Sequence, residues 1–128
     1  MVNKSQYAIL SAAIFFSLIA FPCLINGQTE AKDHTARLVV SFISICCGID
    51  HDAKDKLDSF IARYEKTKGK QLTKSTAHWG REGEIDYCLQ LSPLSRKERK
   101  TFISKVRSLI GKSKLVDIKE NASCQTGR

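Results

Sequence analysis

Apolar and polar residues follow two different periods along this chain, and these periods predict its strands and helices. The stretch 38–48, LVVSFISICCG, is apolar, rich in β-branched residues and bounded by charged segments. It predicts a strand over 36–47 that is apolar on both faces, as strands in the middle of a sheet are. A second strand, over 84–91, alternates strictly and therefore has one apolar and one polar face. Two more polar runs, 71–79 and 114–119, predict strands at the sheet edges.

Two segments with helical periodicity lie between these strands. The first, 52–68, begins in a cluster of aspartates, where carboxylates accept hydrogen bonds from free amides and suit the helix dipole. The second runs from a cap at Ser95 to about residue 110, and Glu98 completes a capping box with Ser95. Each segment has an apolar stripe. The stripes are Ala53, Leu57, Phe60, Ile61 and Tyr64 in the first, and Phe102, Ile103, Val106, Leu109 and Ile110 in the second.

The order of these elements is strand, helix, strand, strand, helix, strand. This is the split βαβ arrangement of ferredoxin-like domains, which belongs to the α+β class. We therefore expect an antiparallel four-stranded sheet with two helices on one face, and with strands 36–47 and 84–91 as the central pair. The predicted domain covers 36–120. A flexible leader, 28–35, precedes it, and a polar tail, 121–128, follows it.

The N-terminal segment has the pattern of a secretory signal peptide. A short polar start with one basic residue, Lys4, precedes an almost continuously apolar run over 7–25, and Asn26-Gly27 ends that run. We expect cleavage after Gly27, which makes the protein secreted or periplasmic. Two alternatives stay open: an uncleaved membrane anchor over 7–25, and lipid attachment at Cys23.

The chain carries a formal charge of +8, and much of the excess falls on the second helix. The predicted basic binding face consists of Arg96, Lys97, Arg99, Lys100, Lys105 and Arg107. Such a face suits an anionic surface or an acidic protein, although a solvated outer helix face would have the same composition. Specific nucleic-acid readout is not expected, because the polar face of strand 84–91 offers Glu84, Asp86 and Gln90 in place of stacking aromatics.

Four cysteines, an even number, remain after signal cleavage, which is typical of disulfides in a small exported domain. The candidates are Cys46, Cys47, Cys88 and Cys124. Successive strand residues point to opposite faces, so we expect Cys47 to pair with Cys88 and Cys46 with Cys124. A direct Cys46–Cys47 bond and free buried thiols are the alternatives. A thiol or soft-metal protein using Cys46, Cys47 and Cys88 is a second functional hypothesis, but the adjacent cysteines lack the usual metal-ligand spacing.

A hairpin turn is predicted at 80–83, and Trp79 and Arg81 at its tip form a candidate recognition spot. The alternative is that Trp79 closes the end of the core.

No catalytic motif is present. The chain lacks the G-x-S-x-G nucleophile elbow and a glycine-rich phosphate loop. A small hydrolase using His51 or His78 is the third hypothesis, and no cofactor or metal is expected. The leading prediction is an exported, disulfide-stabilised binding domain without catalytic activity. Ile43 and Ile45 would form an apolar patch on the uncovered sheet face, which predicts a homodimer through that face.

Overall fold

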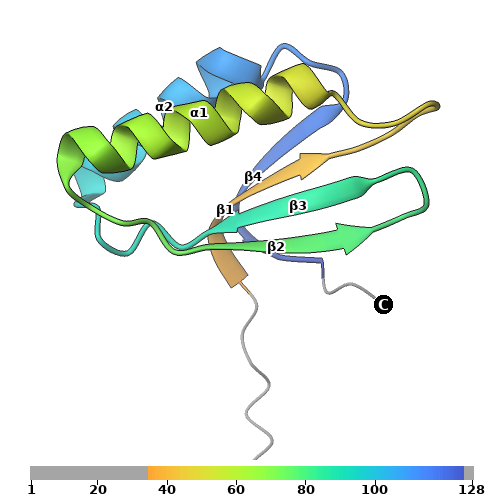
Figure 1. Cartoon of the computed structure of the whole chain (residues 1–128). Coiled ribbons are helices and arrows are strands. Elements are labelled where there is room, and N and C mark those ends of the chain that lie inside the picture. Colours follow the sequence, from red (N-terminus) through yellow and green to blue (C-terminus); the bar gives the residue numbers. More distant parts are fainter. Residues whose placement is uncertain (1–34, 126–128) are drawn as a thin grey trace, which may run out of the picture.

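The structure, a computed structural model, describes residues 35–125 and confirms the ferredoxin-like α+β fold. The elements are β1 (Thr35–Phe42), α1 (His51–Lys68), β2 (Lys74–Trp79), β3 (Glu84–Leu89), α2 (Arg96–Ile110) and β4 (Val116–Ser123). The sheet has the order β2-β3-β1-β4, and every neighbouring pair is antiparallel. Both helices lie on the same face of the sheet (Figure 1). The predicted signal peptide, with its alternative anchor over 7–25, lies outside the described residues. Neither helix within 35–125 is long and apolar enough to cross a membrane.

The central strand β1 is shorter than predicted, which corrects the expected range of 36–47. Its last pairings are at Phe42, with Ile85 of β3 and Val116 of β4. Beyond Phe42 one further backbone bond remains, from the Ile43 N–H to the Leu115 carbonyl at 2.9 Å. Beyond this bond, the apolar run makes no further backbone pairing with β3 or β4 in the described residues, and it leaves the sheet and becomes a loop.

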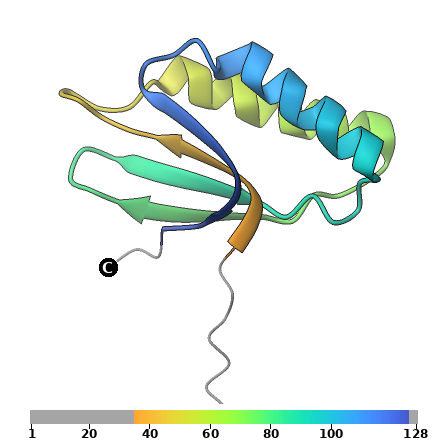
Figure 2. The ribbon, with the colours of Figure 1, turned by 180° about the vertical axis from the view of Figure 1, so that it is seen from behind.

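The last strand, β4, is longer at its C-terminal end than the predicted 114–119. It reaches Ser123 because Ala122 and Ser123 pair with the first two residues of β1. Residues assigned to a polar tail therefore belong to the sheet, and β4 forms one of its edges (Figure 2).

The core fills the space between the helices and the sheet. Alternate residues of the central strands, such as Val40 of β1 and Leu89 of β3, are fully buried there. Phe102 of α2 is also fully buried, and its ring lies against the rings of Phe60 and Tyr64 from α1 at centroid distances of 5.1 and 4.9 Å. These aromatic contacts join the two helices over the sheet.

The face of the sheet opposite the helices, called here the open face, is less open than expected. Its polar residues in β3, Glu84 and Asp86, are only 9% and 1% exposed. The Trp79 indole N–H donates to Asp86 Oδ1 at 2.9 Å, and the Gln125 backbone N–H donates to Asp86 Oδ2 at 3.2 Å. A small apolar cluster around Val39 and Cys88 lies on the same face. The chain therefore covers part of this face with its own side chains and its C-terminal segment.

Candidate functional site

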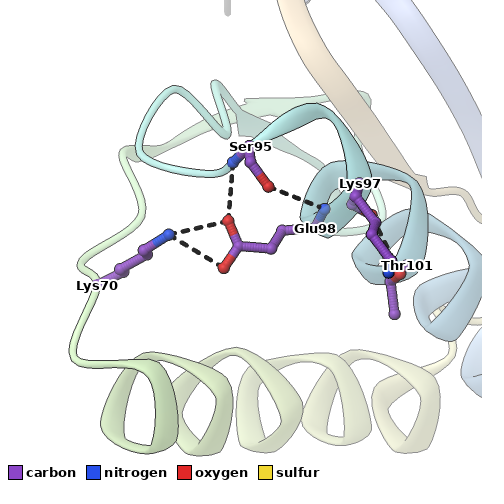
Figure 3. A network of polar contacts seen from close by, with 5 residues as sticks. All are labelled: Lys70, Ser95, Lys97, Glu98 and Thr101. Atoms are coloured by element: carbon purple, nitrogen blue, oxygen red, sulfur yellow. Dashed lines mark hydrogen bonds and ion pairs between the residues drawn. The ribbon is translucent and has the colours of Figure 1, made fainter.

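The N-terminus of α2 is held by a capping box that the sequence predicted correctly. The Ser95 hydroxyl accepts from the Glu98 backbone N–H at 3.3 Å, and the Glu98 carboxylate accepts from the Ser95 backbone N–H at 2.8 Å. The Lys70 ammonium donates to both oxygens of the same carboxylate, at 3.0 and 2.9 Å (Figure 3). The bonds from Lys70 and Ser95 lower the pKa of Glu98 from 4.5 to about 2. Glu98 is the only acidic residue of α2, and it is fully engaged in this network.

The basic residues of α2 are mostly left without acidic partners. We define the α2 basic face as the six predicted residues, Arg96, Lys97, Arg99, Lys100, Lys105 and Arg107. All of them are exposed except Arg99, which is half-buried. Within residues 35–125, only Arg107 of this face forms an ion pair, from its Nη2 to Glu120 Oε1 of β4 at 3.2 Å. The structure therefore places five cations on one helix without a carboxylate to neutralise them.

Three cations of the α2 basic face share one flank of the helix. At the helical repeat, Arg96, Lys100 and Arg107 fall within roughly 40° of the helix circumference. The Arg107–Glu120 contact shows that this flank faces the edge strand β4. A shallow hollow of about 530 Å³ lies along it. Its lining residues are Lys100, Ile103, Ser104, Arg107, Ser108 and Glu120.

This hollow contains residues that the sequence analysis missed. Ser104 and Ser108 are hydroxyl donors next to Lys100 and Arg107, and Glu120 is the counter-charge of Arg107. The regular spacing of Lys100, Ser104 and Ser108, four residues apart, would have revealed the two serines as part of the same helix surface. Glu120 could not be found in this way, because its position beside α2 depends on the packing of β4.

Lys105 lies on a different side of α2, at the junction with α1. It lines a small hollow of about 160 Å³ with residues from the C-terminal half of α1. Two of those residues, Arg63 and Lys68, are also basic, and the floor includes the half-buried rings of Phe60 and Tyr64. The α2 basic face is therefore distributed around the helix and is not confined to the β4 side.

Trp79 and Arg81 do lie together, at the end of the β2–β3 hairpin. Both line a hollow of about 520 Å³, together with His78, Gly80, Gly83, Glu84 and Gln125. Trp79 is half-buried, and its hydrogen bond to Asp86 places it over the open face. Trp79 therefore lies on the open face, and it neither closes the end of the helix-side core nor projects freely into solvent. Arg81 is the exposed member of the pair.

The predicted disulfide pairing was wrong. Cys88 bonds to Cys124, with Cα atoms 6.0 Å apart, and Cys46 and Cys47 are free and exposed. The pairing differs because β1 ends at Phe42, so both adjacent cysteines lie in the loop beyond the strand. Cys124 instead follows β4, close to Cys88 on the open face. The Sγ atoms of Cys46 and Cys47 are 3.0 Å apart, and their hydrogen bond raises the pKa of the Cys47 thiol above 9.0.

The two candidate catalytic histidines lie in different elements of the described part of the chain. His51 is the first residue of α1 and His78 lies in β2, and both are exposed. Within residues 35–125, neither imidazole has a hydrogen bond to a carboxylate or a hydroxyl that would orient it for proton transfer. The nearby Asp50 serves as the N-cap of α1, accepting from the Ala53 N–H at 2.9 Å. Across the same residues, no cluster of three or more potential metal ligands forms.

Comparison of the chain with protein families, with curated proteins and with solved structures finds no match in any of the three.

Proposed function

We propose that this protein is a small exported, disulfide-stabilised binding domain that docks a polyanionic partner on the α2 basic face. The observation that carries the proposal is the distribution of ion pairs. Five cations outside this face lie in ion pairs with carboxylates in the described residues; Lys54 and Lys74, for example, pair with Asp58, and Lys56 pairs with Asp52. Most of the cations on the α2 basic face have no such partner in the described residues.

The shape of the α2 surface favours electrostatic docking over insertion into lipid. The apolar residues of α2 are used in the core, and Leu109, 42% exposed, is the one large apolar side chain that α2 exposes. A helix that inserts into a membrane surface instead presents a continuous apolar face with bulky side chains. The hydroxyls of Ser104 and Ser108 beside Lys100 and Arg107 suit carboxylate, sulfate or phosphate groups, which accept hydrogen bonds. A chain carrying repeated anionic groups is the partner that fits.

The test compares two variants with the same loss of charge. In Lys97→Gln/Lys100→Gln, two exposed lysines of the α2 basic face are neutralised. In the control, Lys56→Gln/Lys119→Gln, two exposed lysines that are paired with Asp52 and Asp117 are neutralised. Retention on immobilised heparin, a sulfated polysaccharide, is measured in a salt gradient, because screening weakens charge-driven binding.

We expect the α2 variant to elute at clearly lower salt than the parent, and the control variant to elute close to the parent. Equal shifts for the two variants would show that only net charge matters, and the proposal of a localised site would then be wrong. Circular dichroism of both variants confirms that the fold is retained, so that a shift in retention reports on binding.

Signal-peptide cleavage and homodimer formation also stay predictions. The intact mass of the exported protein would show whether cleavage occurs after Gly27. The homodimer was predicted from Ile43 and Ile45, but both lie in the loop beyond β1, where Ile45 is 77% exposed. A dimer would have to use this loop or the uncovered part of the open face. Sedimentation that shows only monomer at high concentration would rule out the dimer.

A further inference from the structure

The loop between β1 and α1 projects from the same end of the sheet as the β2–β3 hairpin, as both ribbon views show (Figures 1 and 2). Hydrogen bonds attach the start of this loop to its surroundings. The Ile43 N–H donates to the Leu115 carbonyl at 2.9 Å, and the Ser44 hydroxyl donates to the Glu82 carboxylate of the hairpin turn. The Gly48 N–H closes the loop by donating to Ser44 Oγ at 3.2 Å.

This closed loop brings two thiols into contact in an exposed position. Cys46 and Cys47 are both exposed, and their Sγ atoms are 3.0 Å apart. Cys47 has a φ of 68°, a left-handed conformation that is uncommon for residues other than glycine. The other two described cysteines are bonded to each other, so each thiol of the loop has its neighbour as the nearest sulfur partner in residues 35–125.

We propose that Cys46 and Cys47 form a redox-active dithiol site that exchanges with small-molecule disulfides and closes to a disulfide between adjacent residues. In the first step, a thiolate of the pair attacks one sulfur of oxidised glutathione. The glutathione S–S bond breaks, and one glutathione leaves as a thiolate that takes up a proton. In the second step, the neighbouring thiolate attacks the mixed disulfide and releases the second glutathione. The pair loses two electrons and two protons, and one disulfide becomes two glutathione thiols.

The geometry distinguishes this site from the structural disulfide. Disulfides usually join Cα atoms 4.4–6.8 Å apart, and the Cys88–Cys124 distance of 6.0 Å lies within that range. Adjacent Cα atoms across a trans peptide are only about 3.8 Å apart, so a bond between Cys46 and Cys47 is constrained and easier to reduce. Cys88 is also buried, at 2% exposure, whereas the loop thiols are open to solvent. Exposed and constrained disulfides are the labile ones.

The test uses the full chain in glutathione buffers of graded redox ratio, followed by alkylation, trypsin digestion and mass spectrometry. Cleavage after Arg37 and Lys54 gives a peptide, 38–54, that contains both loop cysteines and no other. Cleavage after Arg81, Arg96 and Lys119 places Cys88 and Cys124 in two separate peptides, 82–96 and 120–128. Each cysteine pair is therefore followed independently, and Cys23 falls in neither set.

We expect oxidised glutathione to convert peptide 38–54 to a form that lacks two hydrogen atoms and resists alkylation. This form should be half reduced at a buffer ratio at least roughly tenfold more oxidising than the ratio that opens Cys88–Cys124. The single variants Cys46→Ser and Cys47→Ser lack the second thiol, so each should stop at a stable glutathione adduct on this peptide.

Three results would overturn the proposal. The first is a stable glutathione adduct on peptide 38–54 of the parent chain, and the second is a disulfide that joins two copies of the chain through this peptide. The third is a Cys46–Cys47 bond that survives conditions in which Cys88–Cys124 is reduced. Retention on heparin is measured separately, so failure of the redox proposal leaves the binding proposal untouched.

Discussion

The two helices contribute in the same way to the buried core, but the charges on their surfaces differ sharply. Both cover the same face of the sheet, and each contributes fully buried residues to one core, such as Leu57 from α1 and Phe102 from α2. Among their charged residues, α1 has four acidic and five basic residues, whereas α2 has one acidic and six basic residues. Packing therefore does not require the charge excess on α2. Within residues 35–125 only Arg107 of the α2 basic face is paired with a carboxylate, so the other cations are available for a partner.

The largest expected effects test the shared role of the helices. Leu57→Ala in α1 should lower the free energy of unfolding by about 2–5 kcal/mol, and Phe102→Ala in α2 by about 3–5 kcal/mol, because each leaves a cavity in a packed core. Urea unfolding with an unchanged m-value measures both losses. A loss below about 1 kcal/mol for either variant would contradict the equal role of the helices in the core.

The N-caps should give the next largest effects. Asp50→Ala and Ser95→Ala each remove a side chain that accepts from a backbone N–H of its helix, which costs about 1 kcal/mol. Asp50 also accepts from the Ser113 hydroxyl at 2.6 Å, so we expect the loss at α1 to be the larger. Thermal unfolding measures both variants. Glycine at the same positions is the matched control, because it costs only a few tenths of a kcal/mol at an N-cap.

The cap predictions show how far local sequence patterns reach. The capping box of α2 and the aspartate cap at the start of α1 were both predicted, because each depends on residues within one helical turn. The end of β1 at Phe42 was not predicted. It depends on where β3 and β4 begin, and those starts are far away in sequence. The disulfide error had the same cause, since both loop cysteines were assigned to a strand that does not reach them.

Acid should weaken α2 through Glu98. The folded-state pKa of about 2 is below the ordinary 4.5, so this carboxylate stabilises the fold above pH 4.5. The stabilisation is lost as the pH falls from 4.5 towards 2, when Glu98 takes up a proton and releases Lys70. We expect the parent to lose more stability than Glu98→Gln between neutral pH and about pH 3.

Urea unfolding at the two pH values measures this difference. The pKa of Asp50 is also lowered, mainly by the Ser113 hydroxyl, so α1 contributes to the acid sensitivity of both proteins. That contribution cancels in the comparison of parent with Glu98→Gln. Identical losses in the two proteins would show that the Lys70–Glu98 pair does not form in solution.

The smallest expected effect on stability belongs to the two variants that compare the α2 basic face with paired lysines of α1 and β4. Neither Lys97→Gln/Lys100→Gln nor Lys56→Gln/Lys119→Gln should shift the urea midpoint beyond measurement error, because exposed charges contribute little to stability. The two variants should nevertheless differ on heparin. A large loss of stability in the α2 variant would mean that these cations serve the fold, and the contrast between the helices would lose its functional meaning.

The sequence by itself determined the order of the elements, the two helix faces, the helix caps and the concentration of positive charge on α2. These properties depend on residues that are neighbours along the chain, where side-chain period and capping chemistry act locally. Only the tertiary structure decided which charges are neutralised, which cysteines meet and how much of the open face is covered. The Arg107–Glu120 pair, the Cys88–Cys124 bond and the Trp79 indole over Asp86 all depend on how the β-strands and α2 pack together. Contacts of this kind depend on strand register and on where each strand ends, and local patterns do not specify either.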